Sequence, residues 1–372
     1  MRDHTRLEVY WSRLARNWEH IQKLAPKARI LPMVKANAYG HGLIPVSRFL
    51  SEELKITTLG VATLGEAEAI VREMPQYRGK VYAFSEINIR DKSSHARYAS
   101  QTILPVISAM EDLDTFLTDR CFKHLPLILK LNTGMNRLGL QDTEWESAGQ
   151  MIKQSGRPIH HLMTHYAYSY APMKTGDRTQ KQFEAFQQGM NLFKAQGISI
   201  EETSLANSGA IEQKYSVDET WVRPGLMLYG PGSFNSKQSW AGEIVSSLVT
   251  RIMKVFPIKK GTPAGYGNHV AHEDGVIAVI PLGYGDGFPT QASGWSFQHE
   301  GFTAKVFGRV NMDMAFLFFP TEALGRIKVG DEVRLWNADQ SAIQTYADHM
   351  QTHTYQALCA LSSRVPRIYR LE

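Results

Sequence analysis

The stretch RILPMVKANAYGHG, residues 29–42, begins as a short apolar run, closes that run on Lys35 and passes at once into a turn rich in glycine. Such a run bounded by turn residues indicates a buried β-strand. A lysine at its end loses hydration, which lowers its pKa and favours the neutral amine that forms a Schiff base with an aldehyde. Lys35 is therefore a candidate catalytic residue, with a lysine that merely reaches water at a strand end as the alternative.

Seven more apolar runs follow this one, and amphipathic segments separate them. The eight predicted strands are RILPMVK (29–35), TTLGVATL (57–64), KVYAFSE (80–86), QTILPVIS (101–108), LPLILKLN (125–132), IHHLMTHY (159–166), SIEETSLAN (199–207) and WVRPGLMLYG (221–230). Apolar residues recur at three and four between them, over 65–74, 111–122, 143–154 and 179–197, which predicts helices. Strand and helix alternating eight times predict an α/β fold, a (β/α)8 TIM-like barrel. Residues 11–25 predict one more amphipathic helix before it.

After residue 230 the pattern becomes β-rich, with Gly, Pro and Asp turns between segments. The predicted β segments are 243–258, 274–283, 303–310, 314–320 and 331–337, and only SAIQTYADHMQ (341–351) has helical periodicity. We therefore expect a domain boundary near residues 231–240. The expected domains are a barrel over 1–235 and a smaller, mostly β domain over 236–372.

Composition excludes several classes of protein. The chain has 41 Lys and Arg against 36 Asp and Glu, a formal charge of +5 without a dense basic run, so we expect no nucleic-acid partner. Cys121 and Cys359 form no metal-binding spacing, and we expect no metal and no disulfide framework. The first 18 residues carry scattered charges and no apolar signal core. The sequence thus predicts a cytoplasmic protein without a membrane partner.

Polar residues lie where five of the predicted strands end, and in a TIM barrel the carboxyl ends of the strands face the active site. They are Lys35; Lys130 and Arg137; His165; Asn207 and Ser208; and Arg223, followed by Gly225 and Leu226. Taken singly, His165 could be a core histidine, Ser208 a helix N-cap and Arg223 a surface ion-pair partner. Backbone N–H groups after ANSG and Arg-Pro-Gly would favour a phosphate. An aldehyde-bearing phosphate that pairs with lysine is pyridoxal 5'-phosphate.

Eight motifs, in this order over most of the chain, resemble those of the alanine racemase family of fold-type III pyridoxal phosphate enzymes. They are VKANAYGHG, LKLNTGMNRLG, ANSGA, VRPGLMLYG, AGYGN, IPLGYGDGF, GRVNMDM and SSRVPRIY. The resemblance implies an isomerase that interconverts L- and D-alanine and supplies D-alanine for peptidoglycan. It also implies a homodimer with shared active sites and a small amino acid as substrate.

The resemblance also implies roles for individual residues. Lys35 resembles the Schiff-base lysine and one catalytic base, and Tyr266 resembles the second base, which in this family comes from the partner subunit. Arg223 would face the pyridine nitrogen, with His165 bridging Arg223 and Tyr266. The phosphate would be held by Tyr39, Ser208, Tyr355 and the backbone of Gly225 and Leu226. The substrate carboxylate would be bound by Arg137 and the backbone N–H of Met312, and Tyr284 would line the mouth of the site.

These roles suit racemisation, which needs acid/base groups on both faces of one carbon. Tyrosine, with a reference pKa near 10, needs nearby positive charge to act as a base. Arginine does not give up its proton. A ring nitrogen that stays unprotonated against Arg223 is a weaker electron sink and disfavours transamination, so the sequence favours a racemase over an aminotransferase or a decarboxylase.

In this family the lysine equivalent to Lys130 is often carbamylated, and we expect a carbamate there that orients Arg137; a lysine reaching solvent is the alternative. Two residues depart from the family pattern. Asn132 stands where Asp is common, and Asn311 stands where Cys or Ser often precedes Met-Asp. The first removes a negative charge near the two cations, and the second bears on which side chains the substrate pocket tolerates.

Three other functions stay open. The closest is a serine or broad-spectrum amino acid racemase, because one methylene is worth only about 1–3 kcal/mol of discrimination. The lack of a recognisable signal peptide favours alanine, since broad-spectrum forms are typically exported. A decarboxylase would place Glu against the ring nitrogen, where this chain has Arg223. A cofactor carrier without catalysis would lack the C-terminal β domain and Tyr266.

Overall fold

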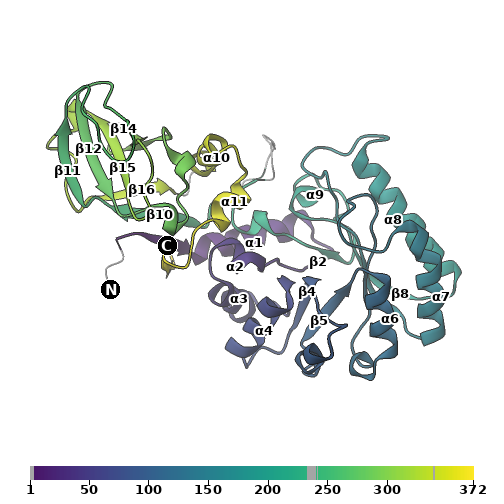
Figure 1. The fold of residues 1–372 in the computed structure, drawn as a ribbon. Helices are drawn as coiled ribbons and strands as arrows, with labels where there is room; N and C mark the ends of the chain where they lie inside the picture. Colours follow the sequence, from purple (N-terminus) through teal and green to yellow (C-terminus); the bar gives the residue numbers. More distant parts are fainter. Residues whose placement is uncertain (1–3, 233–239, 241, 338–339) are drawn as a thin grey trace.

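The computed structural model describes residues 4–232, 240, 242–337 and 340–372. Figure 1 shows a barrel with its helices at one end of the molecule and a β domain at the other, with α1 and α11 between them. The fold class predicted from sequence is confirmed: an α/β barrel followed by a smaller, mostly β domain.

All eight predicted barrel strands are present. They are β2 (Arg29–Ile30), β3 (Thr58–Thr63), β4 (Lys80–Glu86), β5 (Ile103–Ile107), β6 (Ile128–Lys130), β7 (Ile159–Met163), β8 (Ile200–Ser204) and β9 (Trp221–Val222). Strands β3 to β8 pair in parallel in chain order, and β2 pairs in parallel with β9. Parallel bridges from Met33 to Gly60 and from Asn207 to Arg223 join the two groups and close the barrel. The near-continuous apolar runs of the barrel strands are typical of parallel strands that are covered on both faces.

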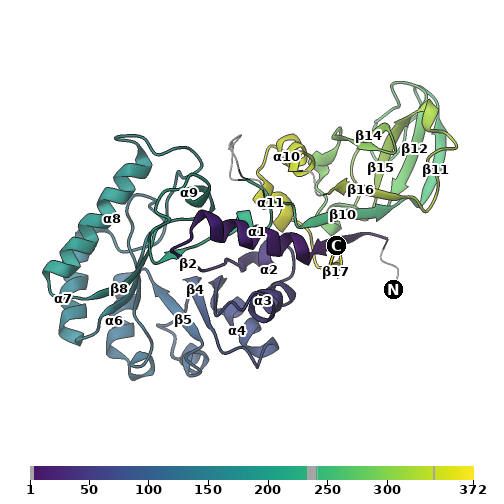
Figure 2. The ribbon, with the colours of Figure 1, turned by 180° about the vertical axis from the view of Figure 1, so that it is seen from behind.

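Helices flank the barrel strands (Figures 1 and 2). They are α1 (Trp11–Leu24), α2 (Lys35–Tyr39), α3 (Leu43–Glu52), α4 (Leu64–Glu73), α5 (His95–Tyr98), α6 (Met110–Thr118), α7 (Trp145–Ser155), α8 (Arg178–Ala195) and α9 (Ser208–Glu212). Of these, α4, α6, α7 and α8 cover the outside of the barrel, whereas α2 and α9 contribute residues to the cavity at the carboxyl ends of the strands. The helices expected from periodicity correspond to α1, α4, α6, α7 and α8. Short or irregular helices such as α2 and α5 were not predicted, because one turn is too short to show a period.

The second domain contains two sheets. Its elements are β10 (Ser246–Arg251), β11 (Lys254–Ile258), β12 (Gly275–Ile280), β13 (Ser296–His299), β14 (Phe302–Phe307), β15 (Ala315–Pro320), β16 (Glu332–Trp336), β17 (Arg367–Arg370), α10 (Gln340–His349) and α11 (Thr354–Cys359). One sheet has the order β11-β12-β15-β14-β13, and the other has β16-β10-β1-β17. The expectation of a single helix here was wrong, because α11, only six residues long, follows α10.

The N-terminal strand β1 (Arg6–Tyr10) belongs to the second of these sheets. It pairs antiparallel with β10 and in parallel with β17 (Figure 2). The expected barrel domain, residues 1–235, includes residues 6–10. The structure instead places these residues in a sheet of the second domain. All five residues of β1 are buried and so need strand neighbours on both sides. The expected boundary near 231–240 falls largely on residues 233–239, outside the described residues.

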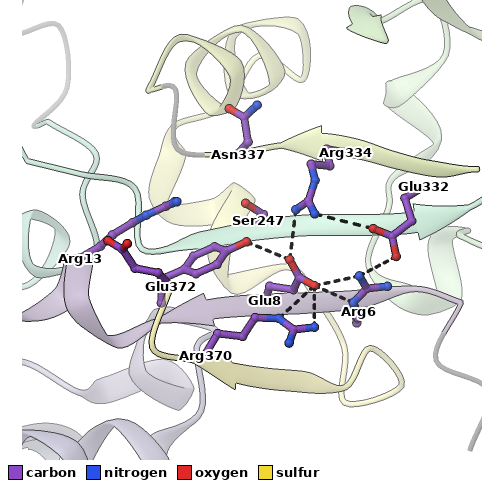
Figure 3. A pocket seen from close by; sticks show the side chains of 10 residues that line it. Arg6, Glu8, Arg13, Ser247, Glu332, Arg334, Asn337, Arg370 and Glu372 are labelled. Carbon is purple, nitrogen blue, oxygen red and sulfur yellow. Dashed lines mark hydrogen bonds and ion pairs between the residues drawn. The ribbon is translucent and has the colours of Figure 1, made fainter. Parts of the chain in front are cut away.

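A buried carboxylate ties the ends of the chain to this sheet. Glu8 is 3% exposed, and its Oε1 accepts from Arg6 Nε (2.9 Å) and Arg370 Nη2 (3.1 Å). Its Oε2 accepts from Tyr10 Oη (2.8 Å) and Arg334 Nη1 (3.1 Å) (Figure 3). Burial alone would raise the pKa of Glu8, but the hydrogen bonds from Tyr10, Arg6 and Arg334 outweigh it and lower that pKa to about 2. Glu8 thereby links β1, β16 and β17.

None of the helices in the described ranges combines the length and the apolar character that crossing a membrane requires.

Candidate active site

A cavity of about 150 Å³ opens at the carboxyl ends of the barrel strands. The sequence-predicted site residues that line it are Lys35, Tyr39, Lys130, Arg137, His165, Ser208, Arg223, Gly225, Leu226 and Tyr355. The other lining residues are Met33, Ala62, Phe84, Ser85, Leu138 and Asn207. The barrel brings together residues from Met33 to Leu226, because every parallel strand delivers its last residues to the same face, and Tyr355 joins them from α11 of the second domain.

Four cations line this cavity, and none of the described residues in its lining is acidic. Burial, followed by the charges of Arg223, Arg137 and Lys35, lowers the pKa of Lys130 to about 8. Burial also lowers the pKa of Lys35, the charge of Arg137 adds to this, and Glu66 and Cys359 partly oppose it. The cavity therefore favours bound anions and neutral lysine amines.

The turn after Lys35 is held by a side chain that the sequence interpretation missed. Val34 N–H donates to Gly60 O (2.8 Å) as the strand ends, and Ala36 N–H then donates to Glu66 Oε1 (2.7 Å). Glu66 forms a capping box with Thr63 at the start of α4. The T-x-x-E spacing that marks such a box was visible in the sequence, but it indicated only a helix start.

A second group of lining residues offers hydroxyls and backbone N–H groups. Ser208 Oγ accepts from Gly225 N–H (2.9 Å) and from Met227 N–H (3.4 Å). A Cβ on Gly225 would lie 2.2 Å from Tyr39 Oη, so only glycine fits beside this tyrosine. Burial raises the pKa of Tyr39 and raises that of Tyr355 to about 12, so both hydroxyls keep their protons. Together these donors suit a phosphate group.

Arg223 is 4% exposed and is bonded only to neutral acceptors. Its Nη1 donates to Ser204 Oγ, and its Nη2 donates to Thr164 O and to Leu205 O (3.2 Å). Burial lowers the pKa of Arg223 to about 10, which leaves the guanidinium protonated at neutral pH. Ser204 and Thr164 were missed by the sequence interpretation, although their place at the ends of β8 and β7 could have indicated them.

His165 lies beside these cations as a neutral ring. Burial, then the charges of Arg223 and Lys130, hold its pKa well below the usual value. Asn207 Nδ2 lies 3.4 Å from His165 Nε2 and also donates to Tyr166 O (3.1 Å). Because the amide is the donor, Nε2 is the acceptor and the ring proton sits on Nδ1.

Asn132, which replaces the Asp common in the family, organises the loop that carries Arg137. Its Nδ2 donates to Asn136 Oδ1 (3.0 Å) and Gln141 Oε1 (2.8 Å). Its Oδ1 accepts from the backbone N–H groups of Gly134 (3.2 Å) and Asn136 (2.9 Å). A carboxylate could not donate to the two amide oxygens, so the surrounding loop matches asparagine.

Three predicted site residues lie elsewhere. Tyr266, Tyr284 and Met312 belong to the second domain and are 67%, 47% and 54% exposed. Tyr284 N–H donates to Asn311 O (3.0 Å), which places the Tyr284 and Met312 segments together. None of the three lines the barrel cavity. One chain therefore presents a cavity with Lys35 and, separately, an exposed tyrosine.

Comparisons with known proteins match both domains of the chain. Residues 9–232 match the family model for the alanine racemase N-terminal domain, and residues 245–369 match that for the C-terminal domain. An alanine racemase of Nitrosococcus oceani is 32% identical over 364 residues, 96% of either chain. The solved alanine racemase of Acinetobacter baumannii has a TM-score of 0.82 and 27% identity over 100% of both chains. That of Streptomyces lavendulae has a TM-score of 0.88 and 23% identity over 100% of this chain and 98% of the other, a likeness of fold.

Proposed function

Because the chain belongs to the alanine racemase family, we propose that it is an isomerase that interconverts L- and D-alanine with pyridoxal 5'-phosphate held in the barrel cavity. The single observation that carries this proposal is the cavity itself. It joins a partly buried lysine of lowered pKa to three further cations and a set of hydroxyl and N–H donors, without an acidic residue in its described lining.

The residues present fit this cofactor. The space that a Cβ on Gly225 would fill, together with Tyr39, Ser208, Leu226 and Tyr355, would hold the phosphate. Lys35 would hold the aldehyde carbon. When bound, the cofactor would supply the electron sink that makes the Cα proton of an amino acid removable.

Two bases on opposite faces of the substrate are required. Lys35 would take or return the proton on one face, and burial, which lowers its pKa, favours the neutral amine that this needs. Tyr266 of a second copy of this chain would act on the other face. Its ring is 67% exposed, so it is available to a neighbouring subunit. His165 accepts a hydrogen bond from Asn207 at Nε2. It would therefore orient that tyrosine through its other ring nitrogen, Nδ1.

Arg223 would face the pyridine nitrogen and keep it unprotonated. The guanidinium is fixed by Ser204, Thr164 and Leu205, and it keeps its proton at neutral pH. A fixed cation at this position favours return of the proton to Cα over transfer of the amino group.

Arg137 and the backbone N–H of Met312 from a second copy of this chain would bind the substrate carboxylate. We further propose that Lys130 carries a carbamate, whose negative charge would hold Arg137 in place among the other cations. The supply of D-alanine for peptidoglycan and a cytoplasmic location are parts of the same proposal, and activity in fractionated cells would test the location.

The experiment that tests this function is chiral chromatography after incubation of the purified protein and pyridoxal 5'-phosphate with single L-amino acids. We expect D-alanine to accumulate and the Lys35→Ala variant to form none. Comparable D-serine or several D-products would instead support the serine or broad-spectrum alternative. No D-product from a protein that retains bound cofactor would refute racemisation.

A further inference from the structure

The four residues after Lys35 have an unusual backbone. Ala36, Asn37, Ala38 and Tyr39 have φ values of 53°, 56°, 52° and 53°, a left-handed turn without any glycine. For residues with a Cβ this conformation is disfavoured, because the Cβ comes too close to the following carbonyl oxygen. Such a run persists only where its surroundings hold it in place.

Part of the support comes from within the turn. Ala38 N–H donates to Val34 O (2.8 Å), and Gly42 N–H donates to Asn37 O (2.9 Å). The Asn37 side chain also accepts from Leu43 N–H (2.8 Å). The first amide of the turn, that of Ala36, instead depends on Glu66, a residue of α4.

The carboxylate of Glu66 connects two strand ends. Its Oε1 accepts from Ala36 N–H (2.7 Å), and its Oε2 accepts from Ala62 N–H (2.9 Å) and Thr63 N–H (3.3 Å). Both oxygens must be acceptors, which an ionised carboxylate provides and an amide does not. Glu66 thus holds the end of β3 and the segment that follows Lys35 at a fixed distance from each other.

We propose that Glu66 is a positioning residue for Lys35: its carboxylate holds the Ala36 amide and so fixes the left-handed turn from which the Lys35 side chain enters the cavity. The catalytic consequence rests on the proposed role of Lys35 as the cofactor lysine. The structural part does not, because the hydrogen bonds of Glu66 belong to the turn itself.

The first test compares Glu66→Gln with Glu68→Gln. Glu68 lies on the same helix but pairs outward with Arg97. In Glu66→Gln the side-chain NH2 group must face a backbone N–H, so one hydrogen bond to a carboxylate is lost. The loss of such a bond corresponds to about a tenfold change in an equilibrium constant or rate. We expect about tenfold faster hydrogen exchange at the Ala36 amide, about tenfold slower capture of the cofactor on Lys35 by borohydride, and a similar fall in kcat with little change in KM. Glu68→Gln should match the unmodified protein in all three.

A second variant separates the turn from the charge of Glu66. Glycine adopts the left-handed region without strain. Adding Ala36→Gly to Glu66→Gln should therefore recover at least half, on a logarithmic scale, of the cofactor capture rate that Glu66→Gln loses. No change of Ala36 exchange in Glu66→Gln, or no recovery with Ala36→Gly, would overturn the proposal. Failure of the unmodified protein to capture the cofactor on Lys35 would refute the proposed function instead, while the exchange measurement would still report on Glu66.

Discussion

At the scale of single residues, the cavity is notable for cations that have no carboxylate partner in its described lining. Lys130 is 6% exposed, and burial together with Arg223, Arg137 and Lys35 lowers its pKa to about 8. Roughly a tenth of such a lysine is a neutral amine at pH 7, far more than for an ordinary lysine. The amine nitrogen can then bond to the carbon of CO2 and release a proton, which replaces a positive charge by a negative one.

This leads to a prediction about Lys130. Protein equilibrated with 13C-labelled bicarbonate should show a carbamate carbon signal in NMR, and Lys130→Ala should lack it. Removing the anion leaves Arg137 unsupported, and we expect kcat/KM to fall about tenfold.

Lys153, on the surface of α7, provides the matched control, and Lys153→Ala should keep both the signal and the activity. A bare amine on Lys130, seen in mass spectra under mild conditions or in high-resolution density, would exclude the carbamate.

At the scale of elements, the strand β1 shows how one charged residue can anchor a strand to its neighbours in a sheet. Its side chain Glu8 lies between arginines of β1, β16 and β17, so the first and last strands of the chain share one carboxylate. Because the folded pKa of about 2 lies below the ordinary value of 4.5, the ionised form is favoured by folding. The resulting stability is fully present above about pH 4.5 and is lost as the pH falls toward 2.

We predict that Glu8→Gln lowers the free energy of unfolding by about 3 kcal/mol at neutral pH, because it removes the buried carboxylate that Arg6, Arg334 and Arg370 share. The variant should also lose the part of the acid destabilisation that falls between pH 4.5 and 2. Urea unfolding at a series of pH values measures both effects.

Glu372 is the control for this measurement. It lies beside the same cluster (Figure 3), but its side chain is 68% exposed and pairs with Arg16 on the surface. Glu372→Gln should change the free energy of unfolding by less than about 0.5 kcal/mol. An equal loss of unfolding free energy in the two variants would show that Glu8 contributes no more to stability than an exposed carboxylate.

At the scale of the whole molecule, the two proposed bases are divided between the two domains. The barrel presents Lys35 in a cavity, and the second domain presents Tyr266 on its surface. If a second copy completes each cavity, the active form is a head-to-tail homodimer with two shared sites.

Mixing two inactive variants tests this arrangement. A dimer of one Lys35→Ala chain and one Tyr266→Phe chain would contain one intact site, formed by Lys35 of one chain and Tyr266 of the other. Random exchange of equal amounts should therefore restore roughly a quarter of the original activity.

Subunit exchange must be shown separately, for example with mass-labelled chains. Proven exchange without recovery of activity would mean that Tyr266 does not act across subunits.

The barrel could be predicted from the sequence because its signals are local. Each strand is an apolar run between turn residues, and each long helix has its own period, so segments such as 80–86 and 179–197 can be assigned without knowing their neighbours. The lysines, arginines and His165 in the cavity lining followed from the same rule, since a parallel barrel gathers its strand ends on one face. Tyr39 and Tyr355 were expected only from the family resemblance. The short helix α11 was missed because six residues contain less than two turns.

The sequence by itself determined the fold class, the family and the charged residues of the barrel cavity, because these depend on periodicity and on motifs that are contiguous in the chain. Only the tertiary structure decided that β1 joins the sheet of the second domain, that Asn132 shapes the loop before Arg137 and that Glu66 holds the turn after Lys35. The physical reason is the same in each case. The strand pairs of β1 and the hydrogen bond from Ala36 to Glu66 join residues at least 30 positions apart, and they depend on where the fold brings the two segments. The contacts of Asn132 span only four and nine positions, but they depend on how the loop closes, and no local pattern encodes either kind of meeting.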